Sequence, residues 1–392
     1  MTKRWRIAAA LSLVAILSGL FVCLASAPRE PVYEGRALTD WLYHHVTSSA
    51  AIPAYNSPGW LQADEALRAI GTNAIPTLVR MIGAKDLSAP MLKLVRWAER
   101  YRWLHIRYRS KIWQNEEAQY AFQILGTNAA SAVPELIRIY EANVSPSSQR
   151  AAAYALGHIG REAQSAVPAL ARRLRDPVVD VRFTAVTVLL LISMSPGSDP
   201  DLLIPPLTAA LKDSSPNVRW NALLGLSNFG SRARPALPEI SKLLNDTGAV
   251  GSFPISHQAE TTIWRIAPEK SGKAIVVEAA TPMVTNGVTT EAVKFLYYGK
   301  HRTLIRAGTH VPAAFQYWSS DPRPRLTLYR GSSESDTNDH LLGEFEVSVV
   351  ADRTVNISTL CVIADGQIYL CARDNTWERW AEIRRVKSMT GK

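Results

Sequence analysis

The sequence has little of what metal, redox or nucleotide chemistry needs. Its 392 residues include three cysteines and eight histidines, and none of them has the spacing of a metal site. There is no glycine-rich phosphate loop, no HExxH motif and no GxSxG motif. The adjacent residues His44 and His45 would point to different sides of a helix, so one metal ion is not expected to bind both. We therefore predict a protein that is not an enzyme and that needs no cofactor.

Long uncharged runs are scarce too, and a single one occurs, at the N-terminus. Residues 7–27 carry no charge and follow three basic residues, and about 20 apolar residues are enough to cross a bilayer. The basic flank predicts that the N-terminus stays in the cytoplasm and that residues 29–392 are exported. Small residues that resemble a cleavage site end the run, but Pro28 follows them and disfavours cleavage. For residues 1–28 we favour an inner-membrane anchor, with the bulk of the chain on the periplasmic side, over a signal peptide whose removal would give a secreted protein.

What the chain does have is an internal repeat of glycine and proline. The prolines are 34, 37 and 33 residues apart, and each lies eight residues after a glycine. The pairs are Gly126 and Pro134, Gly160 and Pro168, Gly197 and Pro205, and Gly230 and Pro238. A period in this range indicates helical units that bury their apolar faces by stacking into a solenoid. Each proline is expected to open the first helix of its unit, where its missing N–H is not needed.

A second pattern joins an aspartate to an arginine six residues later. It occurs as Asp176 with Arg182 and as Asp213 with Arg219. An aspartate in the turn between two helices can accept backbone N–H bonds, and an arginine one turn into the next helix can pair with it or with its neighbour. We expect these four residues to have a structural role in the turns of the repeat.

Together these patterns resemble the HEAT repeat family, in the short bacterial form also found in phycobilin-lyase-like (PBS-lyase-like) repeat proteins. The resemblance covers roughly residues 60–298, and the family's turn aspartate and helix arginine fall on the two pairs just named. It implies an armadillo-like α-solenoid of about six repeats within residues 29–298. It also implies a non-enzymatic scaffold at the cell envelope that binds an unidentified protein partner through the repeat surface, and this is our main functional prediction.

Positive charge is concentrated where the first repeats are lengthened, at about residues 88–115. Residues 93–111 contain seven Lys and Arg against one Glu, and so supply +6 of the net charge of +10; aromatic residues such as Trp97 and Trp113 are interleaved with them. One interpretation is contact with an anionic surface, such as lipid headgroups, through Arg96, Arg100, Arg107 and Arg109. We favour a long helix whose aromatic side chains pack on the first repeats while its arginines stay in solvent. Nucleic acid is not an expected partner, because we predict export.

Near residue 299 the pattern changes from helical repeats to short strands. The expected strands are residues 326–331, 343–350, 355–363 and 367–373. Their spacing predicts a small β-sandwich over residues 299–392. Residues 290–298, just before it, are expected to form the last repeat helix. The predicted fold class is therefore mainly α, with a HEAT-like solenoid followed by a β-sandwich.

Two cysteines of this region, Cys361 and Cys371, flank an expected hairpin with Asp365 and Gly366 at its tip. A two-residue turn would place the cysteines on opposite faces of the hairpin, whereas a three-residue turn would place them diagonally on one face. We favour two buried thiols over a disulfide.

Three segments here resemble the β-subdomain of the substrate-binding domain of DnaK-type heat-shock chaperones. They are Thr303–Pro312, Leu326–Val347 and Ala364–Asp374. In that family the subdomain holds an extended hydrophobic peptide, and the resemblance implies groove positions at Phe315, Trp318, Pro324 and Leu326. No ATPase domain precedes these segments and fewer than 20 residues follow them, so nucleotide-driven cycling is not expected. Passive binding of extended or unfolded polypeptides is therefore the alternative function.

Overall fold

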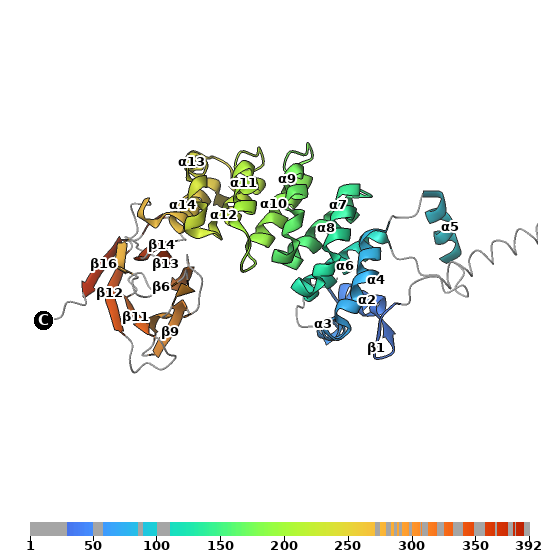
Figure 1. Ribbon diagram of the computed structural model, residues 1–392, viewed down its shortest axis with the longest axis horizontal. Helices are drawn as coiled ribbons and strands as arrows, with labels where there is room; N and C mark the ends of the chain where they lie inside the picture. Colours follow the sequence, from blue (N-terminus) through green and yellow to red (C-terminus); the bar gives the residue numbers. More distant parts are fainter. Residues whose placement is uncertain are drawn as a thin grey trace, which may run out of the picture. The chain divides into compact units, whose positions relative to one another are not determined.

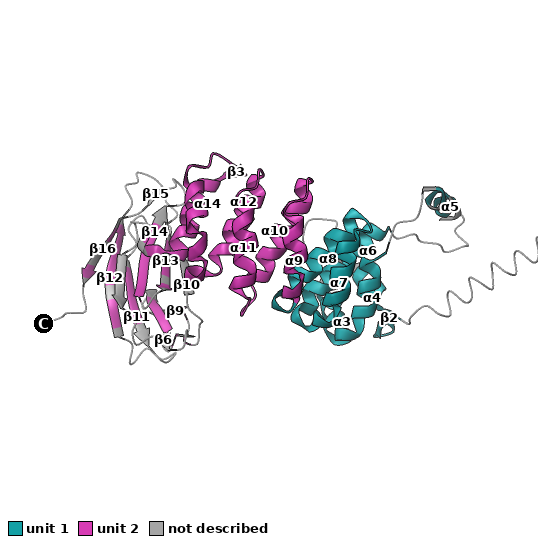
Figure 2. Cartoon of the chain, turned by 45° about the horizontal axis from the view of Figure 1, so that its top comes forward, with its two compact units in different colours: residues 1–162 teal, residues 163–392 magenta. Residues whose placement is uncertain are grey.

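The computed structural model describes residues 30–49, 58–84, 89–99 and 110–270 and, from residue 275 to residue 387, a series of strands (Figure 1). The chain divides into two compact units, residues 1–162 and residues 163–392 (Figure 2). Helices form most of the first unit and the beginning of the second, so the protein is mainly helical.

The first unit contains a short hairpin followed by paired helices. Its elements are β1 (Val32–Tyr33), β2 (Arg36–Ala37), α2 (Leu38–Ser49), α3 (Pro58–Ile70), α4 (Ile75–Ile82), α5 (Ala89–Glu99), α6 (Lys111–Leu125), α7 (Val133–Ala142) and α8 (Pro146–Ile159). Helix α8 packs against α6 and α7, and α6 also packs against α4. The apolar side chains that these helices bury completely include Phe122, Leu136 and Leu156. This burial is the main source of stability, because short helices are marginal on their own.

The second unit begins with helices in the same two-layer arrangement. They are α9 (Val167–Arg173), α10 (Val179–Ser193), α11 (Pro200–Ala210), α12 (Pro216–Ser227), α13 (Leu237–Lys242) and α14 (Ile255–Ile266), with a small hairpin of β3 (Ala249–Val250) and β4 (Phe253–Pro254) before α14. Each first helix of a repeat (α9, α11, α13) packs against the second helix that follows it (α10, α12, α14), and the second helices stack α10 on α12 and α12 on α14. Figure 1 shows the first and second helices of this unit as two rows.

A glycine in the left-handed region ends or follows the second helix in four successive repeats. Its φ angle is +52° at Gly126, +74° at Gly160, +79° at Gly197 and +50° at Gly230. Side chains with a Cβ disfavour this conformation, which explains why the repeat keeps glycine here. In three of the repeats a seven-residue 3-10 turn follows, and the next α-helix begins one residue before the repeat proline. The prediction that proline opens the first helix is confirmed in those three.

The third repeat differs, and the prediction for Pro205 is wrong. Helix α11 already begins at Pro200, so Pro205 and Pro206 lie inside it. The cause is the local sequence after the glycine: the carboxylate of Asp199 accepts the N–H of Asp201 at 2.9 Å, and Pro200 occupies the first helical turn. An N-cap followed by proline starts the helix early and replaces the 3-10 turn.

Beyond residue 274 the described residues form antiparallel sheets. One contains β5 (Ile275–Ala279), β10 (Ala313–Ser319), β13 (Ile357–Ala364), β14 (Gln367–Asp374) and β15 (Arg379–Trp380). The other contains β8 (Ala292–Tyr297), β9 (Lys300–Ile305), β11 (Arg325–Gly331), β12 (His340–Ser348) and β16 (Glu382–Lys387). Strands β6 (Val284–Thr285) and β7 (Val288–Thr289) form a separate hairpin. The four strands expected from the sequence correspond to β11, β12, β13 and β14, and their packing as a sandwich stays a prediction.

The helix expected at residues 290–298 is wrong, because this segment contains strand β8. β8 lies between two partners, with Val293 opposite Ile305 of β9 and Phe295 opposite Leu328 of β11. Both Val293 and Phe295 are buried, and β-branched and aromatic residues suit a strand with neighbours on both sides. The domain boundary expected at residue 298 therefore falls between two paired strands of one sheet, and strands begin as early as Ile275.

The cysteine hairpin has the two-residue connection. Ala364 pairs with Gln367, Cys361 pairs with Leu370, and Cys371 pairs with Leu360. Opposed residues share a face and successive residues alternate, so the two cysteines lie on opposite faces. Both are buried thiols that form no disulfide, and burial raises the pKa of the Cys361 thiol to about 12.

The long helix expected at about residues 88–115 is not continuous. Ser110 is non-helical, and its side chain accepts the N–H of Ile112 at 3.2 Å, so α6 starts anew at Lys111. Trp97 and Trp113 are each 53% exposed, so about half of each side chain faces solvent, and the expected packing of these aromatic residues on the repeats stays a prediction.

Within the part of the chain that the structure describes, no helix is long and apolar enough to cross a membrane. The longest of these helices, α6 and α10, have 15 residues, whereas a span needs about 20. On this finding the predicted localisation, an inner-membrane anchor with an exported bulk, is wrong. The run on which it was based, residues 7–27, lies outside the described residues.

Candidate functional site

The predicted turn residues meet in a ladder of ion pairs in the second unit. Nη1 of Arg182 donates to the main-chain oxygen of Asp176 at 3.0 Å, while its Nε and Nη2 donate to the two carboxylate oxygens of Asp213 at 2.7 and 3.0 Å. Each arginine therefore binds the backbone of its own repeat and the carboxylate of the next. A bidentate pair of this kind fixes orientation as well as distance.

The next rung repeats this geometry. Nη1 of Arg219 donates to the main-chain oxygen of Asp213 at 2.7 Å, and its Nη2 donates to the carboxylate of Asp246 at 2.9 Å. Asp246 was not among the predicted residues. The signal that would have found it is the motif Leu-x-Asp at the end of the repeat. Both Asp213 and Asp246 are the last residue of such a motif.

Burial and ion pairing shift the pKa of Asp213 in opposite directions. Burial alone would raise the pKa of this carboxyl, but the guanidinium of Arg182 and the backbone N–H of Ser215 hold the pKa below its ordinary value. The same bond raises the pKa of Arg182. The side chains are 14% exposed at Arg182 and 7% exposed at Asp213, so the pair is screened little by solvent.

A second set of inter-repeat contacts lies on the second helices. Nδ2 of Asn221 on α12 donates to Oγ1 of Thr187 on α10 at 2.8 Å, and Nδ2 of Asn228 donates to Oγ of Ser193 at 2.9 Å. These two hydrogen bonds join α12 to α10 at two points that lie about 10 Å apart along the helix axis. They fix how α12 is aligned along α10.

Large apolar side chains in contact with solvent lie at the end of α10 and on the β3–β4 hairpin beside α12. Met194 is 64% exposed and Phe253 is 57% exposed, and the ring of Phe253 lies 6.0 Å from that of Trp220. Side chains that are partly exposed on the same helices complete this surface. We call this set the α10–α12 surface: Phe183, Thr187, Met194, Trp220, Asn221, Leu224 and Phe253.

The residues expected to line a peptide groove lie on two different sheets or outside the described residues, and the groove stays a prediction. Phe315 and Trp318 lie on β10, opposite Cys361 and Ser358 in one sheet, whereas Leu326 lies on β11 in the other sheet. Leu326 is only 3% exposed, so it does not line an open groove. Pro324 lies outside the described residues.

The arginines expected to contact an anionic surface are described only in part. Arg96 is exposed on α5, and Arg100, Arg107 and Arg109 lie outside the described residues. In the described part of the chain, no three His, Cys, Asp or Glu side chains gather in a way that could hold a metal ion.

The two-layer stacking of helices, with a glycine turn and an Asp–Arg ladder, defines a helical repeat protein. The HEAT repeat family matches residues 203–233, and the PBS lyase HEAT-like repeat matches residues 148–176. The chain therefore contains HEAT and PBS-lyase-type repeats. The resemblance of the strands to DnaK-type chaperones stays a prediction.

Solved structures with similarity to the chain include repeat proteins. A designed armadillo repeat protein in complex with the peptide (KR)4 is 18% identical, with 58% of this chain and 99% of that chain covered and a TM-score of 0.36. A second designed armadillo repeat protein is 17% identical, with 58% of this chain and 99% of that chain covered and a TM-score of 0.34. A chain from a structure of Kap95p and RanGDP is 13% identical, with 58% of this chain and 28% of that chain covered and a TM-score of 0.34. No curated protein sequence matches the chain.

Proposed function

We propose that this protein is a non-enzymatic scaffold that binds a protein partner through the α10–α12 surface. The observation that carries the proposal is the exposure of Phe253 of β4 beside Trp220 of α12, together with the exposure of Met194 at the end of the neighbouring helix α10. Trp, Phe and Met are enriched at protein interfaces, and Trp is one of the residues that most often dominate the binding energy. Clustered apolar side chains that stay exposed in a folded protein mark interaction sites.

The surface is held in place before any partner arrives. The amides of Asn221 and Asn228 join α12 to α10, and the pair of Arg182 and Asp213 joins the turns at the ends of the same repeats. A surface that is already ordered loses little conformational entropy on binding. This supports binding by a rigid surface rather than by a segment that folds on contact.

The test is site-specific photo-crosslinking in cells of the source organism, followed by affinity measurement. A photoreactive amino acid at position 253 is expected to capture a partner that the same amino acid at Leu244, 41% exposed next to α13, does not capture. With the purified partner, the double substitution Phe253→Ala and Met194→Ala should weaken binding at least about tenfold. The control Leu244→Ala should leave it unchanged. Equal capture from both positions, or affinity unaffected by the double substitution, would show that this surface is not the interface.

Passive binding of extended polypeptides through a chaperone-like groove is not favoured. The groove would need an open apolar slot beside Leu326, and that side chain is buried.

A further inference from the structure

A groove of about 670 Å³ lies between the first helices of two successive repeats, α9 and α11. These helices belong to the row of first helices in Figure 1, whereas the α10–α12 surface is built on second helices and the β3–β4 hairpin. We call it the α9–α11 groove. The side chains of its floor are apolar and mostly small: Ala171, Leu174, Pro205, Pro206, Ala209 and Ala210. Pro205 and Ala209 are exposed, so the floor can be reached from solvent.

The two carboxylates of the groove are already paired. Asp176 lies 3.2 Å from a guanidinium nitrogen of Arg173. Asp213 is held by the bidentate bonds of Arg182, which also lines the groove. Neither aspartate is therefore left to attract a cationic ligand.

Two cations of the groove are free to bind a ligand. Among the described residues, the guanidinium of Arg175 forms neither an ion pair nor a hydrogen bond. Lys212 is 67% exposed and shares the carboxylate of Glu239 with Lys242, which lies closer to it, at 2.8 Å against 3.5 Å. The charges that remain available at the rim are therefore positive, and an acidic ligand complements them.

Two main-chain oxygens beside the groove lack their helical donors. In an α-helix the N–H of residue 205 would bind the oxygen of Asp201, and that of residue 206 would bind the oxygen of Leu202. Pro205 and Pro206 have no N–H, so these two oxygens remain available as acceptors. A helical carbonyl points toward the residue four positions ahead, and both prolines line the groove. The N–H groups of a chain that lies along α11 can therefore bind there.

The turn that follows α9 exposes two valines next to the groove. Val178 is 53% exposed and Val179 is 43% exposed, and the N–H of Val178 donates to the carboxylate of the groove residue Asp176 at 3.0 Å. At the same point of the next repeat, 37 residues later, the chain has Ser215 and Pro216. Val178 is the N-cap of α10, a position that valine suits poorly. Helix formation therefore does not explain the valines, whereas contact with an apolar ligand does.

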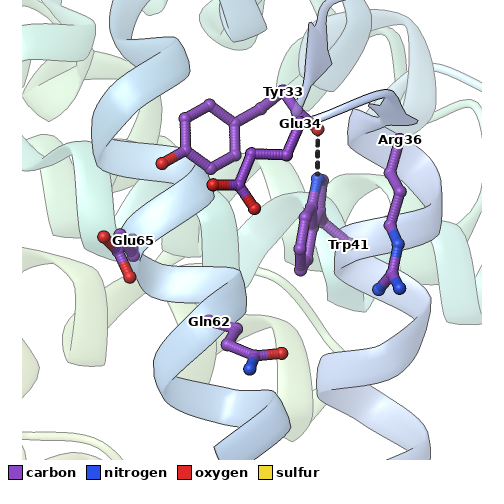
Figure 3. Close-up of a pocket in the computed structure, with 6 residues that line it drawn as sticks. All are labelled: Tyr33, Glu34, Arg36, Trp41, Gln62 and Glu65. Carbon is purple, nitrogen blue, oxygen red and sulfur yellow. Dashed lines mark hydrogen bonds between the residues drawn. The ribbon is translucent and has the colours of Figure 1, made fainter.

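The α9–α11 groove differs from the pocket of about 340 Å³ at the start of the first unit (Figure 3). There Trp41 is only 5% exposed, and its indole Nε1 donates to the main-chain oxygen of Tyr33 at 3.1 Å. The guanidinium of Arg36 lies 5.0 Å from the centroid of the same ring. Groups of the chain itself thus occupy the aromatic part of that pocket, and it offers a ligand no open ring.

We infer that the α9–α11 groove binds an extended segment of a partner protein in which carboxylates alternate with aliphatic side chains. In an extended chain, successive side chains point to opposite sides. The carboxylates can then pair with Arg175 and Lys212 at the rim, while the aliphatic side chains lie on the alanine and proline floor. This goes beyond the proposed function, because the groove and the α10–α12 surface lie on different helices.

The probe is the peptide acetyl-Ala-Glu-Leu-Glu-Leu-Glu-Ala-amide, and its matched control has glutamine in place of each glutamate. Binding of the fluorescein-labelled peptides to the full-length protein is measured by fluorescence anisotropy. We expect saturable binding of the acidic peptide, at least about tenfold tighter than that of the glutamine peptide, and weaker at higher salt. The double substitution Phe253→Ala and Met194→Ala should leave this binding unchanged, so the groove and the α10–α12 surface are tested separately.

Two variants at exposed positions test the groove itself. Arg175→Gln with Lys212→Gln should weaken binding of the acidic peptide at least about tenfold. Its matched control, Arg80→Gln with Arg138→Gln, removes two exposed arginines of the first unit and should leave binding unchanged. Ala209→Phe fills the groove but keeps its cations, and it too should weaken binding at least about tenfold. Ala209→Ser keeps the groove open and should retain full affinity.

Melting temperatures close to that of the wild type will show that the variants are folded. Equal binding of the two peptides, no saturable binding of either, or full affinity in either groove variant would overturn the inference. Equal weakening by the groove pair and by the control pair would overturn it as well, because the attraction would then come from net charge alone.

Discussion

At the scale of single residues, Asp213 carries more contacts than its position in a turn would suggest. Its carboxylate accepts from Arg182 and from the N–H of Ser215 at 2.8 Å, and its main-chain oxygen accepts from Arg219. One residue thus receives hydrogen bonds from the repeat before it and from its own repeat. Removing its charge leaves a largely buried guanidinium without its partner, which is costly.

We predict that Asp213→Asn destabilises the protein by about 2 kcal/mol at neutral pH. The folded-state pKa of Asp213 is lowered, so the stability that its charge contributes is fully present above the unfolded pKa. It is lost as the pH falls through the lowered folded pKa. The difference between wild type and variant should therefore shrink in acid, as measured by urea denaturation at neutral pH and near pH 3.

The control for this prediction is an exposed pair. Arg161 and Glu162 lie 3.0 Å apart with side chains 50% and 41% exposed, so Glu162→Gln should change stability by less than about 1 kcal/mol at either pH. If Asp213→Asn behaved in the same way, the ladder would not stabilise the repeats.

At the scale of elements, the glycine between helix and 3-10 turn determines where each repeat bends. Gly126 has φ +52° and ψ −133°, a combination that is essentially restricted to glycine. A Cβ placed on Gly126 would meet no atom within 4 Å. The cost of a side chain here therefore comes from the backbone alone.

We predict that Gly126→Ala destabilises the first unit by about 1–3 kcal/mol. The matched control is Gly83→Ala at the end of α4, where φ is −76° and the nearest side-chain atom, Cδ1 of Ile139, lies at 3.4 Å. Gly83→Ala should be close to neutral, as measured by thermal denaturation of both variants. Equal melting temperatures would contradict the idea that the left-handed conformation is required.

The sequence predicts elements best where a residue type is forced by backbone geometry. The repeat glycines and three of the four prolines have the predicted places because positive φ and helix starts select them. The start of α11 was missed because Asp199 and Pro200 form a cap that competes with the repeat signal. Strand β8 was missed because its pairing with β9 and β11 is not visible in residues 290–298 alone. The α10–α12 surface could not be identified either, since exposure at Phe253 and Trp220 depends on how helices stack.

At the scale of the whole molecule, contacts between helices run from one repeat to the next. α8 contacts α6 and α7, and α12 contacts α10, α11 and α14. In such an arrangement stability is a sum of local terms, and a defect in one repeat spreads only to its neighbours. The division into two compact units is consistent with this view.

We predict that Leu136→Ala, in the fully buried core of α7, costs about 2–5 kcal/mol and acts locally. Hydrogen–deuterium exchange followed by mass spectrometry should become faster in α6, α7 and α8. Exchange in β11 and β12 should stay as in the wild type. Faster exchange over the entire chain would show a single cooperative unit instead.

The Asp–Arg ladder has a direction, and this bears on how the chain can change in length. Each arginine reaches forward to the aspartate of the following repeat, as Arg182 reaches Asp213 and Arg219 reaches Asp246. Deleting residues 183–219, one period of 37 residues, would leave Arg182 in the place of Arg219 with Asp246 ahead of it. Duplicating the same stretch would add one guanidinium and one carboxylate together. Copy-number changes that remove or add an arginine together with its aspartate therefore conserve the charge pairing, whereas a cut that removes only one of the two leaves a buried charge without its counterpart.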